Sequence, residues 1–154
     1  ATRYRGRARV RNRGAAHHFP TYMAPKVELA FYRRKADGSV SALGRHVIGW
    51  QVDTPITHEI ADTRIPAGAT REFAQPFEAA GDDWRLELVV SVSPGEHYER
   101  IFRDSLNRAD AFPPKAVDLL RQAMVEVEGK RYGLLRTTVD AASAMMVGEI
   151  GIAK

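Results

Sequence analysis

The stretch Trp84-Arg85-Leu86-Glu87-Leu88-Val89-Val90-Ser91-Val92 decides the fold class. Most of its apolar residues fall on one side of an extended chain, whereas Arg85, Glu87 and Ser91 share the other side. An alternation of period two is typical of a strand that is buried on one face. The turn residues Ser93-Pro94-Gly95 follow it, so we expect the strand to end there.

Similar segments precede this strand and are separated by Gly, Pro, Asn and Asp residues. They are Thr2 to Arg13, the segment with Val27, Leu29 and Phe31 that ends in Arg33-Arg34-Lys35, Arg45 to Val52, Glu59 to Ile65, and Thr70 to Phe77, which Pro76 interrupts. No long helical pattern lies between these segments. The order predicts an antiparallel sandwich rather than a parallel sheet built from β-α-β units.

After Gly95 the apolar residues recur at helical spacing. One helix is expected around Tyr98, Ile101, Phe102 and Leu106, and a second from Pro113-Pro114 to Gly129 with Val117, Leu120, Met124 and Val127 on one stripe. Arg131 to Val139 suits a further strand of uncertain position. We therefore predict a mainly β (α+β) fold, an antiparallel Ig-like β-sandwich with two short C-terminal helices.

The domain organisation predicted from these patterns is a single domain over residues 1–154. Its parts are a sandwich over about 2–95, a helical segment over about 96–129, and a strand with a tail over 130–154. The tail from Ala141 to Lys154 is small and apolar, so we expect it to pack on a neighbour or to fray.

Composition limits the function classes. The chain has 154 residues, 44% of them hydrophobic and 27% charged, as in ordinary soluble globular proteins. No apolar run approaches 18 residues, so no membrane span is expected. The absence of cysteine excludes a disulfide framework, a thiol nucleophile and a CxxCH haem-attachment motif. A net charge of +4 mildly favours anionic partners.

The charge is concentrated in the first segment. Tyr4, Ala8 and Val10 share one side of it, and the other side carries Arg3, Arg5, Arg7, Arg9, Arg11 and Arg13. Same-side residues of a strand lie about 7 Å apart. This row predicts a contact surface for an acidic partner, haem propionates or phosphates; the alternative is a solvated face crossed by Glu residues of a neighbouring strand. Acidic residues throughout the middle of the chain make nucleic acid an unlikely partner.

The corner from Asn12 to Tyr22 holds two adjacent histidines, His17 and His18. One of them can ligate a metal or a haem iron that a partner presents, with its other ring nitrogen held by a backbone carbonyl or a carboxylate. The alternative is a corner histidine that hydrogen-bonds its own loop. Adjacent side chains of an extended backbone point to opposite sides, so at most one faces a given site.

Several segments resemble a known family. The stretch Asn12 to Tyr22 followed by Ala24 to Val27, and the later Arg45 to Gly49 and Asp62 to Gly68, look like the β-sandwich region that follows haem-binding segments in extracytoplasmic multihaem c-type cytochrome proteins. The likeness covers roughly residues 4 to 139. The family pattern is approximately Asn-x-Gly-Ala-Gly-His-x-x-Pro-Thr.

The matching residues here are Asn12, Gly14, His17, Pro20 and Thr21, next to Phe19, with Ala16 in place of the second glycine. The resemblance implies a periplasmic or extracellular domain whose partner is a multihaem cytochrome segment or subunit. Without a CxxCH motif the chain binds no haem covalently, so the haem c would come from the partner segment or chain.

The sequence shows little that points to an enzyme. The serines have no GxSxG context, and no Gly-rich phosphate loop is present. The pairs His58-Glu59 and Glu96-His97 are best interpreted as carrying surface histidines. We therefore predict no enzyme, but a non-catalytic structural or docking module of a multihaem electron-transfer assembly.

Two alternatives stay open. One is a generic ligand- or protein-binding sandwich of the adhesion or carbohydrate type, with no redox role. The other, ranked last, is a metal-dependent hydrolase that uses His17, His46, His58 or His97.

Overall fold

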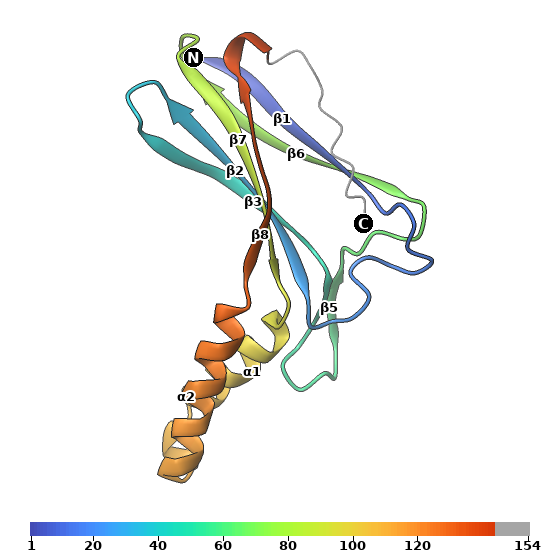
Figure 1. Ribbon diagram of the computed structural model, residues 1–154, viewed down its shortest axis with the longest axis vertical. Coiled ribbons are helices and arrows are strands. Elements are labelled where there is room, and N and C mark those ends of the chain that lie inside the picture. The colour runs from blue at the N-terminus through green and yellow to red at the C-terminus, as the bar shows by residue number, and fades with distance from the viewer. Residues whose placement is uncertain (144–154) are drawn as a thin grey trace.

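The computed structural model describes residues 1–143, which are mainly antiparallel β-structure with two helices near the C-terminus (Figure 1). The prediction of a mainly β sandwich with two short helices is confirmed. The elements are, in order, β1 (Thr2–Arg11), β2 (Lys26–Lys35), β3 (Val40–Ile48), β4 (Trp50–Val52), β5 (Glu59–Asp62), β6 (Thr70–Ala79), β7 (Trp84–Ser93), α1 (Glu96–Leu106), η1 (Ala109–Ala111), α2 (Pro114–Gly129), β8 (Tyr132–Asp140) and η2 (Ala141–Ser143). The predicted tail lies outside the described residues from position 144 on.

The larger sheet has the strand order β3-β2-β7-β8. Its centre is the antiparallel pair of β2 with β7, which runs in unbroken register from Lys26 opposite Ser93 to Lys35 opposite Trp84. Both strands are rich in apolar residues and have neighbours on both sides. The stretch from Trp84 to Val92 therefore forms a central strand.

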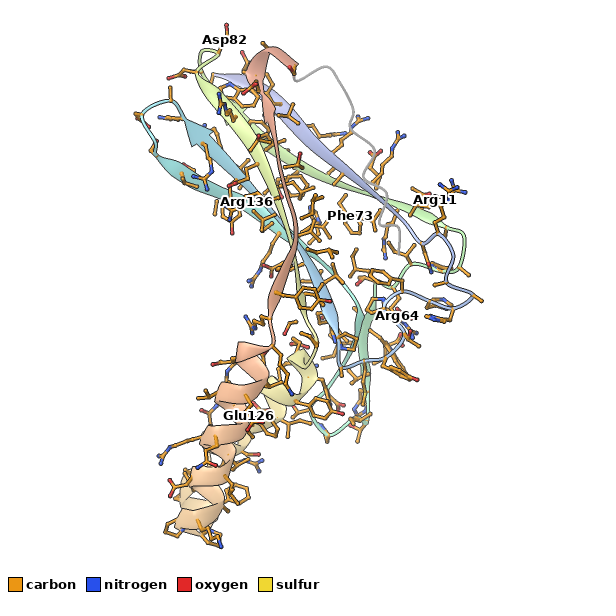
Figure 2. The ribbon with its side chains drawn as sticks, viewed as in Figure 1. Arg11, Arg64, Phe73, Asp82, Glu126 and Arg136 are labelled. Carbon is orange, nitrogen blue, oxygen red and sulfur yellow. The ribbon has the colours of Figure 1, made fainter. Side chains whose placement is uncertain are left out.

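The second layer is a two-stranded sheet in which β1 pairs with β6. Its apolar side packs on the larger sheet, and Figure 2 shows Phe73 between the two layers. The main core consists of Ala8, Val10, Val27, Leu29, Phe31, Ile48, Ile65, Phe73, Leu88 and Val90. Burial of each large apolar side chain stabilises the fold by about 1.5–3 kcal/mol, so this core holds the two sheets together.

Several predicted strand boundaries were wrong. Pro76 does not interrupt β6, which continues to Ala79, because a strand with one neighbour tolerates a residue without a backbone N–H. Gly49 splits the predicted strand Arg45 to Val52 between β3 and β4; a Cβ there would lie 2.3 Å from the Lys26 side chain. The next strand ends at Asp62, and Ile65 instead forms an isolated bridge with Phe19.

The two helices are inserted between the adjacent strands β7 and β8 and project together from one end of the sandwich (Figure 1). They contact each other more than they contact the sheets. Pro113 and Pro114 begin α2, as expected for residues that cannot donate a backbone hydrogen bond inside a helix. Of the helices that the structure describes, neither is both long and apolar enough to cross a membrane.

The expectation that Glu87 lies on an exposed polar side together with Arg85 and Ser91 was wrong. It is 3% exposed, because β2 and β8 flank β7 and each covers the carboxylate with an arginine. Arg34 approaches it at 2.8 Å and Arg136 at 3.5 Å. On the outer side of the larger sheet, ion pairs therefore connect β7 to β2 and to β8.

Candidate functional site

The arginines of β1 form an exposed row. Residues of β1 alternate between exposed and buried positions because each second residue faces the core. We call the exposed residues Arg3, Arg5, Arg7, Arg9 and Arg11 the arginine face. Figure 2 shows Arg11 extending from the end of β1 on the side away from the larger sheet. The predicted alternation of these five side chains is thus present in the structure.

Only part of this positive charge is compensated by β6. Glu78 lies opposite Arg3 at 3.7 Å, and Glu72 lies 3.7 Å from Arg7 and 3.2 Å from Arg9. Five arginines face two glutamates, so three positive charges are in excess. Exposed ion pairs of this kind contribute little to stability and are weakened by salt.

Two members of the arginine face have no carboxylate partner among residues 1–143. Arg5 lies opposite Pro76 and Arg11 opposite Thr70. Neither Pro nor Thr can compensate a guanidinium group. The predicted alternative was a face crossed by Glu residues of the neighbouring strand. It holds at Arg3, Arg7 and Arg9 but not at Arg5 and Arg11.

Arg13, the sixth predicted arginine, lies beyond the end of β1. It is exposed and precedes Gly14, whose φ of +93° marks a turn in the left-handed region. Only glycine adopts this region without steric cost. Arg13 thus belongs to the corner that follows the strand rather than to the arginine face.

The corner from Asn12 to Thr21, here named the histidine corner, is held in place by a buried side chain. Asn12 is 5% exposed, and its amide donates hydrogen bonds to the carbonyl oxygens of His17 at 2.8 Å and Ile65 at 3.0 Å. Phe19 and Ile65 exchange two backbone hydrogen bonds, and Pro20 is buried. Residues of the family pattern therefore fix the loop to the β5–β6 connection.

His17 is the histidine whose ring the corner orients. Its Nδ1 lies 2.9 Å from the carbonyl oxygen of His18 and 3.0 Å from the Thr21 hydroxyl. A carbonyl only accepts hydrogen bonds, so this contact requires the proton on Nδ1. In the neutral ring the lone pair is then on Nε2, and the residue is exposed. This is the arrangement that metal-bound histidines use.

No other histidine of the described residues forms a metal site together with His17. His46 lies on β3 against the rings of Phe31 and Phe73, and His58 lies in an exposed loop with Asp53. Nowhere in the described part of the chain do three His, Cys, Asp or Glu side chains gather closely enough to hold a metal ion. With these residues alone, His17 can therefore contribute one ligand to a metal that another chain holds.

His97, predicted to be a surface histidine, is fully buried. Its backbone is in the first turn of α1, where the helix meets the sandwich, and Arg100 donates to its Nδ1 at 3.1 Å. Burial lowers the pKa of His97, and the neighbouring charges of Arg100 and Lys26 lower it further. The interpretation as a surface residue was wrong because the spacing along one helix does not show what packs against it.

A group of charges at this place was not predicted from the sequence. We call it the junction cluster: Lys26, Glu96, Glu99, Arg100 and Arg131. Lys26 Nζ lies 3.4 Å from Glu96, which also pairs with Arg100 at 3.0 Å. Arg131 Nε donates to Glu99 at 3.0 Å, and the Ser93 hydroxyl donates at 2.9 Å.

Burial and the neighbouring charges shift the pKa values of Glu99 and Lys26. Burial alone would raise the pKa of Glu99, but the hydrogen bonds from Arg131 and Ser93 outweigh burial, and the pKa lies below its usual range. Burial lowers the pKa of Lys26, and Glu96 only partly offsets this. The one sequence signal for the cluster was the spacing of Glu96, Glu99 and Arg100 along a single helix.

Comparisons with protein-family models, with curated proteins and with solved structures find no match for this chain.

Proposed function

We propose that the chain is a non-catalytic docking module that binds the anionic surface of a partner protein through the arginine face. The observation that carries the proposal is the row of five arginines on one exposed side of β1, against only two glutamates on β6. Such a row repels itself, and a negatively charged partner relieves the repulsion. Guanidinium groups bind carboxylates in a bidentate geometry, which adds orientation to attraction.

The shape of the arginine face favours an extended partner over a small ligand. The strand has ten residues and therefore a length of about 34 Å. Its arginines repeat at about 7 Å, so a single small anion would meet at most two of them. A macromolecular surface with several carboxylates would meet all five, and the encounter would be accelerated by electrostatic steering.

From the histidine corner we infer a more specific partner: the haem-bearing part of an extracytoplasmic multihaem c-type cytochrome. The corner directly follows the arginine face along the chain, and His17 is an exposed residue whose ring is held through Nδ1. Arginines can bind haem propionates while a neutral imidazole nitrogen approaches the iron. This arrangement supports a ligand role for His17. The periplasmic or extracellular location follows only from the resemblance to the cytochrome family.

The docking proposal is tested with poly-L-glutamate as the acidic probe. The triple variant Arg5→Gln/Arg9→Gln/Arg11→Gln removes three charges from the arginine face. A matched control, Arg85→Gln/Arg108→Gln/Arg121→Gln, removes three exposed charges elsewhere. Isothermal titration at low salt should show at least a tenfold loss of affinity for the first variant, about 1.4 kcal/mol, and less than threefold for the control.

Two results would contradict the docking proposal. One is an equal loss of affinity in both triple variants, which would mean that only the net charge matters. The other is binding that does not weaken as salt is raised from 50 to about 300 mM, since a contact between exposed charges must be screened.

The haem form of the proposal is tested separately with a haem c peptide that has one vacant axial position. Addition of the full chain should shift the haem absorption spectrum, and His17→Ala should abolish the shift while His18→Ala keeps it. An unchanged spectrum with the wild-type chain would remove the ligand role of His17. If the arginine face still binds the acidic probe in that case, a protein-binding sandwich without a redox role becomes the better description.

A further inference from the structure

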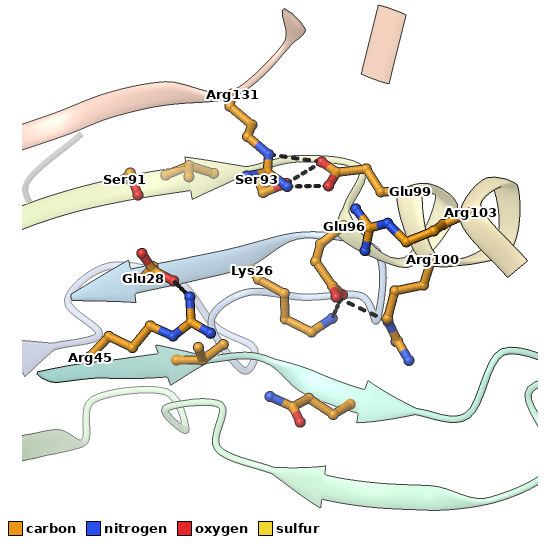
Figure 3. A pocket seen from close by; sticks show the side chains of 13 residues that line it. Lys26, Glu28, Arg45, Ser91, Ser93, Glu96, Glu99, Arg100, Arg103 and Arg131 are labelled. Atoms are coloured by element: carbon orange, nitrogen blue, oxygen red, sulfur yellow. Dashed lines mark hydrogen bonds and ion pairs between the residues drawn. The ribbon is translucent and has the colours of Figure 1, made fainter. Parts of the chain in front are cut away.

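A pocket lies where the outer side of the larger sheet meets α1 (Figure 3). Its volume is about 340 Å³, at the lower end of the range of small-molecule sites. Side chains from β2, β3, β4, β7, α1 and the residue before β8 line it: Lys26, Glu28, Arg45, Val47, Gln51, Ser91, Val92, Ser93, Glu96, Glu99, Arg100, Arg103 and Arg131. None of these residues belongs to the arginine face.

The lining is electropositive. It contains five cationic side chains and three carboxylates, which leaves two positive charges in excess. Each carboxylate already has a cation: Glu28 lies 3.6 Å from Arg45, and Glu96 and Glu99 are paired within the junction cluster, as the dashed lines in Figure 3 show. An additional anion would therefore not compete with an uncompensated acid.

Donors remain unused in this pocket. Within residues 1–143, the Arg103 guanidinium makes no ion pair, and the Ser91 hydroxyl and the Gln51 amide make no side-chain hydrogen bond. They come from α1, β7 and β4, so they approach the pocket from different elements. Val47 and Val92 add a small apolar surface. Polar groups that converge over an apolar surface are typical of a ligand site.

Lys26 gives a second reason to expect an anion. It is 5% exposed, and Glu96, its one carboxylate partner among residues 1–143, also pairs with Arg100. Its ammonium group also donates to the neutral carbonyl oxygen of Met23. Isolated cations are costly to bury, and two cations on one carboxylate remain under-compensated. A bound negative charge in the adjacent pocket would lower this cost.

We propose that this pocket binds a small dianion carrying carboxylate or phosphate groups, with Arg45 and Arg103 as the two guanidinium contacts. Arg45 is on β3 and Arg103 on α1; two guanidinium groups from separate elements fit a ligand with two negative charges. Ser91 and Gln51 would donate hydrogen bonds to the same ligand. The inference goes beyond the docking function and uses different residues.

The test uses the full chain and two probes, succinate for the dicarboxylate class and inorganic phosphate for the phosphate class. Each is titrated at low ionic strength and followed by NMR amide shifts. Saturable binding of at least one probe is expected, and the tighter one identifies the ligand class. Arg103→Gln and Arg45→Gln should each weaken that binding about tenfold, since each removes a charged hydrogen-bond donor from the ligand.

The controls separate the pocket from the rest of the surface. Arg121→Gln removes an exposed arginine of α2 that pairs with Asp118 and should change the affinity less than twofold. The triple variant of the arginine face should also leave it unchanged. The proposal is overturned if neither probe binds, if Arg103→Gln and Arg45→Gln bind like the wild type, or if the arginine-face variant abolishes binding.

Discussion

Two regions of this molecule are rich in charge, and they differ in exposure and in the number of partners. The arginine face is exposed to solvent, and its five arginines have only two glutamates of β6 as partners within residues 1–143. In the junction cluster, Glu99 is 1% exposed and Lys26 5% exposed, and both acids of the cluster are paired. Charges in the first region can be changed at little cost in stability, whereas those in the second hold α1 against the sandwich.

The difference teaches that the same residue types serve binding in one place and stability in the other. An exposed ion pair contributes about 0–1 kcal/mol because water and salt compete with it. A buried charge that loses its partner is expensive, because desolvation is no longer offset. Excess charge therefore destabilises the fold least where it stays hydrated, as along β1.

The largest effect is expected for Glu99→Ala in the junction cluster. The substitution leaves the buried side of Arg131 and the Ser93 hydroxyl without an acceptor. Loss of one partner of a fully buried pair costs about 3–5 kcal/mol. Because Arg131 is half exposed, we expect a smaller loss of unfolding free energy, about 2 kcal/mol, measured by urea denaturation.

Glu126→Ala is the matched control for that experiment. Glu126 is an exposed residue of α2, visible in Figure 2, and its removal should change the unfolding free energy by no more than about 0.5 kcal/mol. A similar loss of unfolding free energy in both variants would contradict the claim that buried charges stabilise the fold more than exposed ones.

A medium effect is expected from pH, through His97. Its folded-state pKa lies below the usual value, because burial disfavours the charged ring and Arg100 and Lys26 repel it; Glu96 and Asp53 oppose this only partly. Below about pH 6.5 the unfolded chain takes up a proton that the folded chain does not. The unfolding free energy therefore falls as the pH drops, by at most about 1.4 kcal/mol per pH unit from this group.

His97→Gln tests this assignment by urea denaturation between pH 7 and 5. The variant should show a flatter pH dependence, whereas His18→Gln retains His97 and should keep the wild-type slope. The lowered pKa of Glu99 adds a separate loss at more acidic pH, where the unfolded chain already carries protonated glutamates. An unchanged slope in His97→Gln would show that other groups set the pH dependence.

The smallest effect on stability is expected at the arginine face. The triple variant Arg5→Gln/Arg9→Gln/Arg11→Gln removes one exposed ion pair and reduces repulsion along β1. We expect its unfolding free energy to stay within about 0.5 kcal/mol of the wild type. Thermal and urea denaturation at low salt measure it. A loss above about 2 kcal/mol would mean that these arginines are structural.

The sequence predicted the arginine face because one strand determines it: alternation along β1 is local. It did not predict the junction cluster, since Glu99 and Arg131 are 32 positions apart and the helices that separate them had no predicted packing. Glu87 was misjudged for a related reason. Alternation indicates two sides of a strand, but whether the polar side is exposed depends on the neighbours, here Arg34 and Arg136.

The histidine corner lies between these cases. The residue pattern from Asn12 to Thr21 marked the loop as distinctive, and the opposite directions of adjacent side chains limited the site to one histidine. The pattern did not reveal that Asn12 holds the loop through Ile65, 53 positions away. Nor did it show that Thr21 and a backbone carbonyl orient the His17 ring.

The most direct test of the central claim is an NMR titration of the isotope-labelled full chain with poly-L-glutamate, observing backbone amides and arginine Nε groups together. We predict salt-sensitive shifts that are largest along β1 and in the histidine corner and small for α1 and Arg131. Shifts centred on the junction cluster, or shifts that spread over every exposed arginine alike, would contradict the central claim.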